Sequence, residues 1–248
     1  MRLGCLVLHG LTSSLATVDG LVPYLRAREL PYRLPLLRGH GATPDALRGV
    51  TWRGWHDDAA RALDDLLGEC ERAVVIGLSM GGVVALHLAA ERPERLAGVA
   101  AIAPALRLAG TARDQLRVGL AAAANRFIAV DPRNAYLDAD LAAASTNYPR
   151  APARTVLSLV SYGRMVERLL PRVRVPLLVV YTPRDRVVDP AAIRSAFDRA
   201  GTPPDDKQLV AVDGSGHEMM QDREREAVFD AIMVFVAQVR SRAVAAAE

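Results

Sequence analysis

Lysine is nearly absent from this 248-residue sequence: Lys207 is its only lysine, although Lys and Arg together number 31 and Asp and Glu 28. Mechanisms that need a P-loop lysine or a Schiff-base lysine at any position other than 207 are therefore excluded. Kinases, P-loop ATPases and PLP enzymes are excluded with them. The formal net charge of +3 is close to balance, and no basic cluster alternates with aromatic residues as on a nucleic-acid-binding surface. We expect no nucleic-acid partner.

Cysteines and long apolar runs are also scarce. The two cysteines, Cys5 and Cys70, lack the spacing of a metal site or a disulfide framework, which favours a reduced, cytoplasmic protein. The apolar run at 3–8 is too short for the core of a signal peptide. No segment approaches the roughly 18 to 20 uninterrupted apolar residues of a membrane span, so we expect a soluble protein without stable membrane insertion.

Short apolar runs alternate regularly with longer amphipathic stretches. We expect strands at 3–8, 32–37, 73–76, 96–102, 175–181 and 208–212, and helices at 17–28, 52–69, 82–92, 190–200 and 224–240. This order predicts an α/β fold with a mostly parallel central sheet and helices on both faces. The length suits one such domain, 1–248, whose ligand site should lie at the carboxyl ends of the strands.

The alternation is interrupted between residues 106 and 171, which we interpret as a small inserted helical cap. Two helix-patterned segments, 113–130 and 155–170, flank a loop-rich piece. The first carries an apolar stripe that includes Leu116, Leu120, Phe127 and Ile128. That stripe either packs on the main domain or roofs an apolar substrate pocket, and the helical pattern is compatible with both.

The pentapeptide Gly77-Leu78-Ser79-Met80-Gly81 joins a predicted strand to a predicted helix. A G-x-S-x-G turn in this context is tight, and its small flanking residues let strand and helix approach closely enough to expose the serine hydroxyl. Ser79 is therefore the candidate nucleophile. The alternative is an ordinary strand-to-helix turn that contains a serine.

An activated serine needs a base, and the chain offers five histidines. His217 follows the last predicted strand in a glycine-rich loop that can place its ring over Ser79, so it is our candidate base. His9 and His40 precede glycines after earlier strands, and we interpret them as loop-ordering groups. His56 and His87 lie in helix patterns, and His87 is more than two helical turns beyond Ser79.

The base in turn needs a carboxylate that fixes its tautomer and stabilises its protonated form. Asp185 follows the strand at 175–181 directly and is the best placed candidate. Asp189 opens the next helix, where an N-cap role is the natural explanation. Asp213 precedes the histidine loop, where it suits a turn.

Attack on a carbonyl also requires donors for the developing oxyanion. One should be the backbone N–H of Met80, the residue after the nucleophile. The second should come from the loop after the first strand, where we choose the N–H of Leu11. Both donors are main-chain groups, so the turns matter more than the side chains.

Several motifs carry a family resemblance. Ser79, Asp185 and His217 occur in that chain order, together with L-H-G-L-T at 8–12, R-G-H-G at 38–41, and the tryptophan pair Trp52 and Trp55. The sequence thus resembles the α/β-hydrolase superfamily and, more narrowly, its bacterial carboxylesterase and monoacylglycerol lipase group. That group typically carries H-G-F-T-G, G-H-G, a tryptophan pair, G-L-S-[LM]-G-G and S-G-H. The resemblance covers most of the chain outside the cap.

The resemblance implies a serine nucleophile, its two partners and two oxyanion donors at the positions already derived. Leu11 stands where the group usually has phenylalanine, and Ser13 replaces the second glycine of the first motif, which changes the expected shape of the acyl pocket. The chain begins at the strand leading to His9. We therefore expect an abbreviated version of the fold, with about six strands plus short extras.

The predicted function is hydrolysis of carboxylic esters, either short to medium acyl esters or monoacylglycerols, with a small-molecule ester as the partner. No cofactor or metal is required. The same residues would also serve a thioesterase, a lactonase, a carbon–carbon bond hydrolase or an acyltransferase. A hypothesis of another class is a non-catalytic homologue that binds a small molecule, because a fold does not fix a function.

Overall fold

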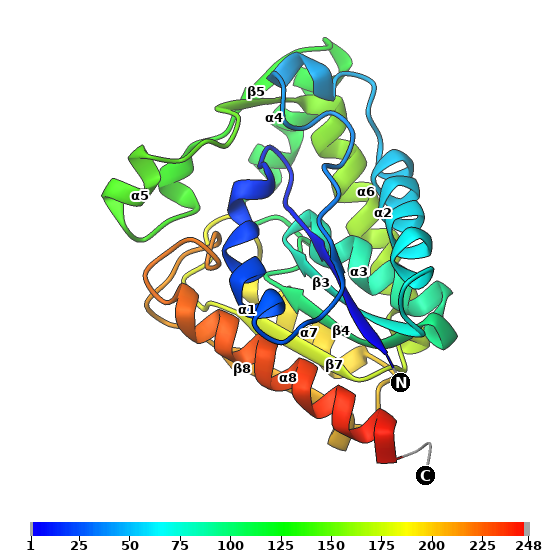
Figure 1. Ribbon diagram of the computed structural model, residues 1–248. Helices are drawn as coiled ribbons and strands as arrows, with labels where there is room; N and C mark the ends of the chain where they lie inside the picture. The colour runs from blue at the N-terminus through cyan, green and yellow to red at the C-terminus, as the bar shows by residue number, and fades with distance from the viewer. Residues whose placement is uncertain (1, 246–248) are drawn as a thin grey trace.

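The computed structural model describes residues 2–245 and has a six-stranded sheet at its centre (Figure 1). The strand order is β2-β1-β3-β4-β7-β8, and each neighbouring pair is parallel. The strands are β1 (Leu3–Leu8), β2 (Tyr32–Arg33), β3 (Arg72–Leu78), β4 (Leu96–Ile102), β7 (Leu177–Tyr181) and β8 (Lys207–Ala211). The predicted parallel sheet of about six strands is confirmed.

Helices cover both faces of the sheet, as predicted (Figure 1). One face is covered by α1 (Val22–Arg26) and α8 (Arg225–Ala245). The other face packs against α2 (Trp52–Leu67), α3 (Met80–Glu91), α6 (Ala153–Leu169) and α7 (Pro190–Arg199). Within the described residues, no helix combines the length and apolarity needed to cross a membrane.

The two cores follow from the alternation of side chains along each strand. In β1, Leu6 and Leu8 belong to the core under α2 and α3, whereas Cys5 and Val7 belong to the core under α1 and α8. Each face of a central strand is thus buried, which explains why these strands read as continuous apolar runs rather than as an alternating pattern.

Two predicted elements are shorter than expected. The strand predicted at 32–37 ends at Arg33, and Pro35, which has no N–H to donate to a ladder, follows soon after. The helix predicted at 17–28 is interrupted at Val18, which has the non-helical angles φ −132° and ψ −13°. The 3-10 turn Asp19–Leu21 then leads directly into α1. Pro23 lies in the first turn of α1, where its missing N–H has no helical partner to lose.

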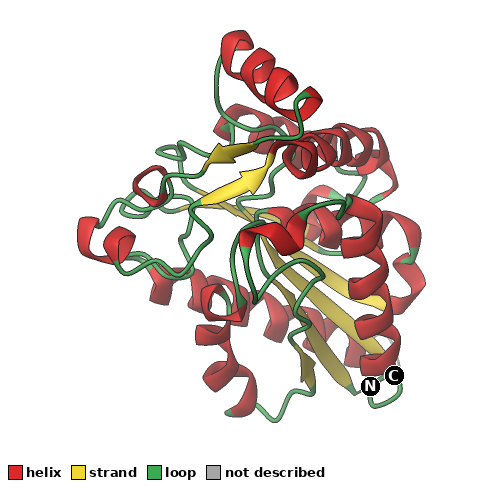
Figure 2. Ribbon diagram, turned by 90° about the horizontal axis from the view of Figure 1, so that it is seen from above, coloured by secondary structure: helices red, strands yellow, loops and turns green. Residues whose placement is uncertain are grey.

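The segment between β4 and β7 contains α4 (Ala112–Ala123), β5 (Phe127–Ala129), α5 (Ala139–Ala143), β6 (Arg150–Pro152) and α6. The helix predicted at 113–130 was wrong in its last third: Asn125 has φ 51°, and β5 pairs with β6 in a small antiparallel sheet. Figure 2 shows this pair set apart from the main sheet. The predicted helix at 155–170 corresponds to α6.

The segment is not detached from the sheet. Tyr162 and Val166 of α6 are fully buried in the same core as α3, and α6 packs directly on α3. The part that lies beyond the helical layer therefore runs from α4 to β6. The division of the chain into one domain with a cap at 106–171 stays a prediction, and the core position of α6 favours a narrower cap.

Candidate active site

Ser79 lies in a sharp turn between β3 and α3, with φ 56° and ψ −115°. The turn is tight enough to require glycines: a Cβ on Gly77 would lie 2.1 Å from the Gly81 carbonyl oxygen, and one on Gly81 would lie 2.4 Å from the Leu8 carbonyl oxygen. Backbone strain of this kind is characteristic of the G-x-S-x-G elbow. The serine is therefore presented at the carboxyl edge of the sheet.

The structure brings the three predicted side chains together in one hydrogen-bonded chain. Ser79 Oγ and His217 Nε2 are 2.8 Å apart, and His217 Nδ1 and Asp185 Oδ2 are 2.8 Å apart. All three residues are buried, with Ser79 6% exposed. With a proton on Nδ1, the ring donates to Asp185 and accepts the serine hydroxyl proton at Nε2, which is the arrangement that activates a serine.

Asp185 is held in place by the loop after β7. Its Oδ1 accepts hydrogen bonds from the N–H groups of Val187 and Val188, both at 2.8 Å, which leaves Oδ2 for His217. Asp189 caps α7 by accepting from Ala191 N–H at 2.9 Å, as the sequence predicts. Asp185, and not Asp189, is therefore the carboxylate that is hydrogen-bonded to His217.

The pKa values of Asp185 and His217 shift in opposite directions from their ordinary values. Burial is the largest influence on Asp185 and opposes its ionisation, but His217 and the amides of Val187 and Val188 outweigh it and lower the Asp185 pKa. Burial also opposes the charged form of His217, but the Asp185 carboxylate, with a smaller contribution from Glu218, raises the His217 pKa above its usual value. The Asp185 carboxylate thus stabilises the protonated form of the His217 imidazole.

Asp222 fixes the loop that carries His217, a role that no sequence pattern predicts. Its Oδ2 accepts from Gly216 N–H at 2.7 Å and from Leu137 N–H at 2.8 Å. It therefore joins the histidine loop to the segment inserted between β4 and β7. No local motif marks such a residue, because one of its partners is 85 positions away in the sequence.

Glu218 is a second buried carboxylate beside His217. Its Oε1 accepts from Asn147 Nδ2 at 2.9 Å, whereas Glu218 Oε2 and Asn147 Oδ1 find no partner among the described residues. Burial raises the pKa of Glu218. The one feature of the sequence that pointed to Glu218 is its position directly after the candidate base, His217.

The predicted oxyanion loop passes close to the serine. A Cβ built on Gly10 would lie 3.3 Å from Ser79 Cβ, so the backbone that leads to Leu11 is in contact with the nucleophile. Ser13, which replaces a glycine of the family motif, donates from Oγ to the Gly10 carbonyl at 3.0 Å. Met80, whose N–H is the other predicted donor, is the first residue of α3 and directly follows Ser79.

Two buried histidines order this loop, in agreement with the sequence analysis. His9 Nε2 accepts from Leu37 N–H at 3.1 Å, and His40 Nε2 accepts from Thr12 N–H at 3.2 Å. The Nδ1 atom of each ring faces a carbonyl, that of Gly10 for His9 at 2.8 Å and that of Leu37 for His40 at 3.0 Å. Both rings therefore act as neutral donor and acceptor between loops.

The apolar stripe of α4 faces outward. Leu116 and Leu120 are each 63% exposed, so these two side chains neither pack on the main domain nor close over Ser79. A cavity of about 820 Å³ lies between α4 and α6, and Val118 and Val160 are among the residues that line it. Ser79 does not line that cavity.

Comparison with known proteins places this geometry in a family. The model of the family described as serine aminopeptidase, S33, matches residues 1–224. The chain belongs to the serine aminopeptidase S33 family. The match spans both Ser79 and His217, the two ends of the hydrogen-bonded chain.

Two curated relatives match this S33 family member over nearly its whole length. A thermostable monoacylglycerol lipase from Bacillus sp. (strain H-257) is 25% identical, with 95% of this chain and 90% of the relative covered. A carboxylesterase from Bacillus subtilis (strain 168) is 24% identical, with 93% and 91% covered. The predicted resemblance to the carboxylesterase and monoacylglycerol lipase group is therefore confirmed.

A solved structure from the metagenome-derived lipolytic enzymes LipS and LipT superposes on this S33 family member with a TM-score of 0.86. The two chains are 28% identical, and the superposition covers 96% of this chain and 94% of the other. The predicted α/β-hydrolase fold is confirmed. The family description names a peptidase, whereas these relatives are named as lipolytic enzymes or esterases.

Proposed function

We propose that this protein is a serine carboxylester hydrolase in which Ser79 is the nucleophile, His217 the general base and Asp185 its partner. The observation that carries the proposal is the hydrogen-bonded chain from Ser79 through His217 to Asp185, with 2.8 Å at each link. Full-length relatives named as a monoacylglycerol lipase and a carboxylesterase support the same chemistry.

In the acylation step, His217 Nε2 takes the proton from Ser79 Oγ as the oxygen attacks the ester carbonyl carbon. The N–H groups of Leu11 and Met80 hydrogen-bond the resulting oxyanion, and each such donor contributes about 3 to 4 kcal/mol in related sites. The tetrahedral intermediate collapses, His217 returns the proton to the leaving alkoxide, and an alcohol departs. Water, deprotonated by His217, then releases the carboxylic acid from Ser79.

The proposed substrates are small-molecule esters with short to medium acyl chains, or monoacylglycerols. The names of the relatives support this class. Cytoplasmic localisation stays a prediction; both cysteines are free and buried, which agrees with a reducing compartment.

Hydrolysis of a chain-length series of p-nitrophenyl esters tests the proposal. We expect turnover by the wild type, a loss of about 10³-fold or more in Ser79→Ala, and wild-type rates in Ser161→Ala. Ser161 is an exposed serine of α6, and therefore a matched control. Undiminished activity in Ser79→Ala would refute the mechanism.

The bond that is cleaved is tested by parallel panels. Initial rates on oxygen esters should exceed those on matched thioesters, lactones and aminoacyl p-nitroanilides, the last because the family description names aminopeptidases. A preference of about tenfold or more for one of the other panels would keep the serine mechanism and replace the substrate class. Tight binding of a small molecule without turnover by either wild type or Ser79→Ala would support the non-catalytic alternative.

A further inference from the structure

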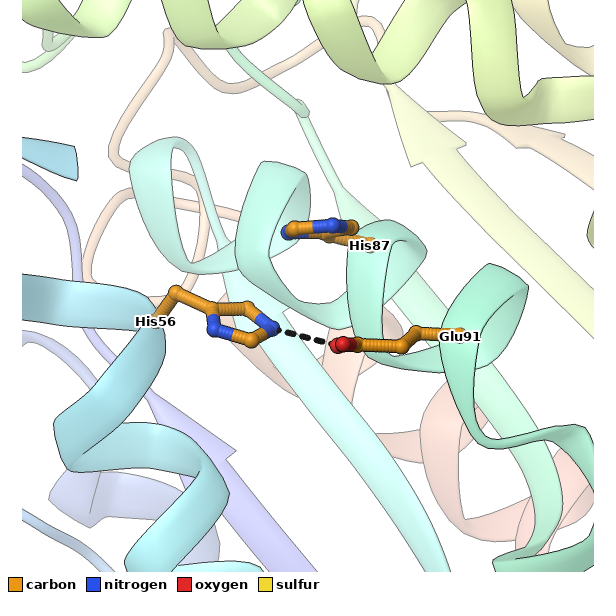
Figure 3. Close-up of side chains that lie close together, drawn as sticks. All are labelled: His56, His87 and Glu91. Carbon is orange, nitrogen blue, oxygen red and sulfur yellow. Dashed lines mark hydrogen bonds and ion pairs between the residues drawn. The ribbon is translucent and has the colours of Figure 1, made fainter. Parts of the chain in front are cut away.

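Three potential metal ligands meet on the outer side of the helical layer, away from Ser79. His56 lies on α2, and His87 and Glu91 lie on α3 (Figure 3). One atom from each residue can be chosen so that all three atoms lie within 4.8 Å of one another. His56 Nε2 and Glu91 Oε2 are 2.8 Å apart, and the centroids of the two imidazole rings are 4.3 Å apart. The three side chains therefore converge on one point between the helices.

The spacing on α3 suits metal binding. Residues four apart on a helix lie on the same face, so His87 and Glu91 present their side chains one turn apart toward α2. Two imidazoles and one carboxylate form a ligand set that Zn²⁺ accepts, with water in the fourth position. Asp57 Oδ1, 3.8 Å from His56 Nδ1, adds a second negative charge near the cluster.

His87 is prepared to act as a ligand. Its Nδ1 is 3.0 Å from the Tyr162 hydroxyl, and in the tautomer with a proton on Nδ1 it donates there and leaves the Nε2 lone pair free. A polar partner on the second ring nitrogen is a common feature of metal-bound histidines. The ring of Trp52 stacks on Tyr162 and holds this partner in place.

The adjustment needed to bind a metal is small. Ligand atoms about 2.0 to 2.1 Å from a tetrahedral Zn²⁺ lie about 3.3 Å from one another. The contact between His56 and Glu91 must therefore open slightly, and the longer separations must close. Glu91 is the last residue of α3 and its side chain is 48% exposed, so it can move without disturbing the core.

We propose that His56, His87 and Glu91 form a binding site for one Zn²⁺ ion that links α2 to α3. The site is independent of the proposed hydrolase mechanism. His87 is eight residues beyond Ser79 on the helix, a rise of about 12 Å at 1.5 Å per residue. The bound ion stabilises the folded protein, because an unfolded chain does not hold the three ligands together.

Calorimetric titration of chelator-treated protein with Zn²⁺ tests the site. The wild type should bind one ion per chain, and its melting temperature should rise with Zn²⁺ concentration. In Glu91→Gln and His56→Gln the affinity should fall by at least about tenfold, the lower end of the loss seen when even an outer-shell group is removed. Glu94→Gln, an exposed glutamate just after α3, should bind as the wild type does.

His217 is a competing imidazole, and two readouts separate it from the cluster. Co²⁺ should give the visible absorption bands of a tetrahedral site in the wild type and lose them in Glu91→Gln. Glu91→Gln without metal should keep the wild-type melting temperature and ester hydrolysis, since Glu91 is exposed and distant from Ser79. Absence of saturable binding with Zn²⁺ at about tenfold excess over protein, or equal affinity in wild type and Glu91→Gln, would overturn the proposal.

Discussion

Among single residues, the two aspartates of the loop after β7 make different contacts and should respond differently to substitution. Asp185 accepts two backbone hydrogen bonds and still reaches His217 Nδ1, whereas Asp189 caps α7. Asp185→Asn should lower kcat by about 10⁴-fold, because an amide stabilises the wrong imidazole tautomer. Asp189→Asn should stay close to wild type, since asparagine also caps helices. Equal losses in the two variants, measured by steady-state kinetics, would contradict this assignment.

A second residue-scale prediction concerns Glu218. Its negative charge is one of the influences that raise the His217 pKa, so Glu218→Gln should lower that pKa. The base must be neutral in the free enzyme, and the acidic limb of the kcat/KM profile should therefore move to lower pH, by about one unit or less. Glutamine can still accept from Asn147, so the fold should persist. A limb that moves to higher pH would contradict the prediction.

The serine, histidine and aspartate could be predicted because each has a local signal: a glycine-framed elbow, a glycine-rich loop after the last strand, and a strand end. Asn147 and Asp222 carried no such signal. Their partners lie 71 and 85 positions away, and only the folded insertion brings them together. Interactions of this kind depend on tertiary contacts that no local pattern encodes.

At the scale of elements, the elbow between β3 and α3 depends on glycines that cannot be enlarged. A Cβ on Gly81 would meet the Leu8 backbone at 2.4 Å, so Gly81→Ala should destabilise the protein by about 1 to 3 kcal/mol and reduce activity. Gly119 of α4 has open space around its Cβ position, and Gly119→Ala should stabilise by up to about 1 kcal/mol. Urea unfolding compares the pair, and a reversed order would contradict this account of the turn.

The order of strands and helices in the main sheet could be predicted well because long amphipathic stretches and buried apolar runs dominate it. The errors occur where non-local pairing or a single backbone angle decides. Phe127 and Ile128 fit a helical stripe in the sequence. In the structure, Asn125 has a left-handed backbone conformation that a helix cannot continue through, and the residues after it pair with β6 as a strand. Pattern alone could not indicate that pairing.

At the scale of the whole molecule, buried neutral histidines make the fold sensitive to acid. Burial lowers the pKa of His9 to about 3, with the neighbouring His40 adding to the effect, and burial lowers the pKa of His40 to about 4. Between about pH 6.5 and pH 4 the unfolded chain binds protons that the folded protein does not, so stability falls as the pH falls. Each ring contributes up to about 1.4 kcal/mol per pH unit in that range.

Urea unfolding at about pH 6.5, 6 and 5.5 measures this slope in the upper part of that window, before most carboxylates titrate. His40→Gln should reduce the slope, because glutamine removes one titrating ring while keeping polar atoms for the Thr12 and Leu37 backbone. A slope that is unchanged in this variant would show that His40 does not contribute to acid unfolding.

Attack of Ser79 on the ester carbonyl can be tested by trapping the nucleophile. It is measured with a p-nitrophenyl phosphonate ester. A serine nucleophile attacks the phosphorus atom and displaces p-nitrophenolate, which leaves a phosphonyl-serine adduct that water does not readily hydrolyse. We predict one equivalent of p-nitrophenol per chain and, by peptide mass spectrometry, the phosphonyl group on Ser79, with neither in Ser79→Ala. A label on another residue, or no label on a protein that still hydrolyses p-nitrophenyl esters, would contradict the account.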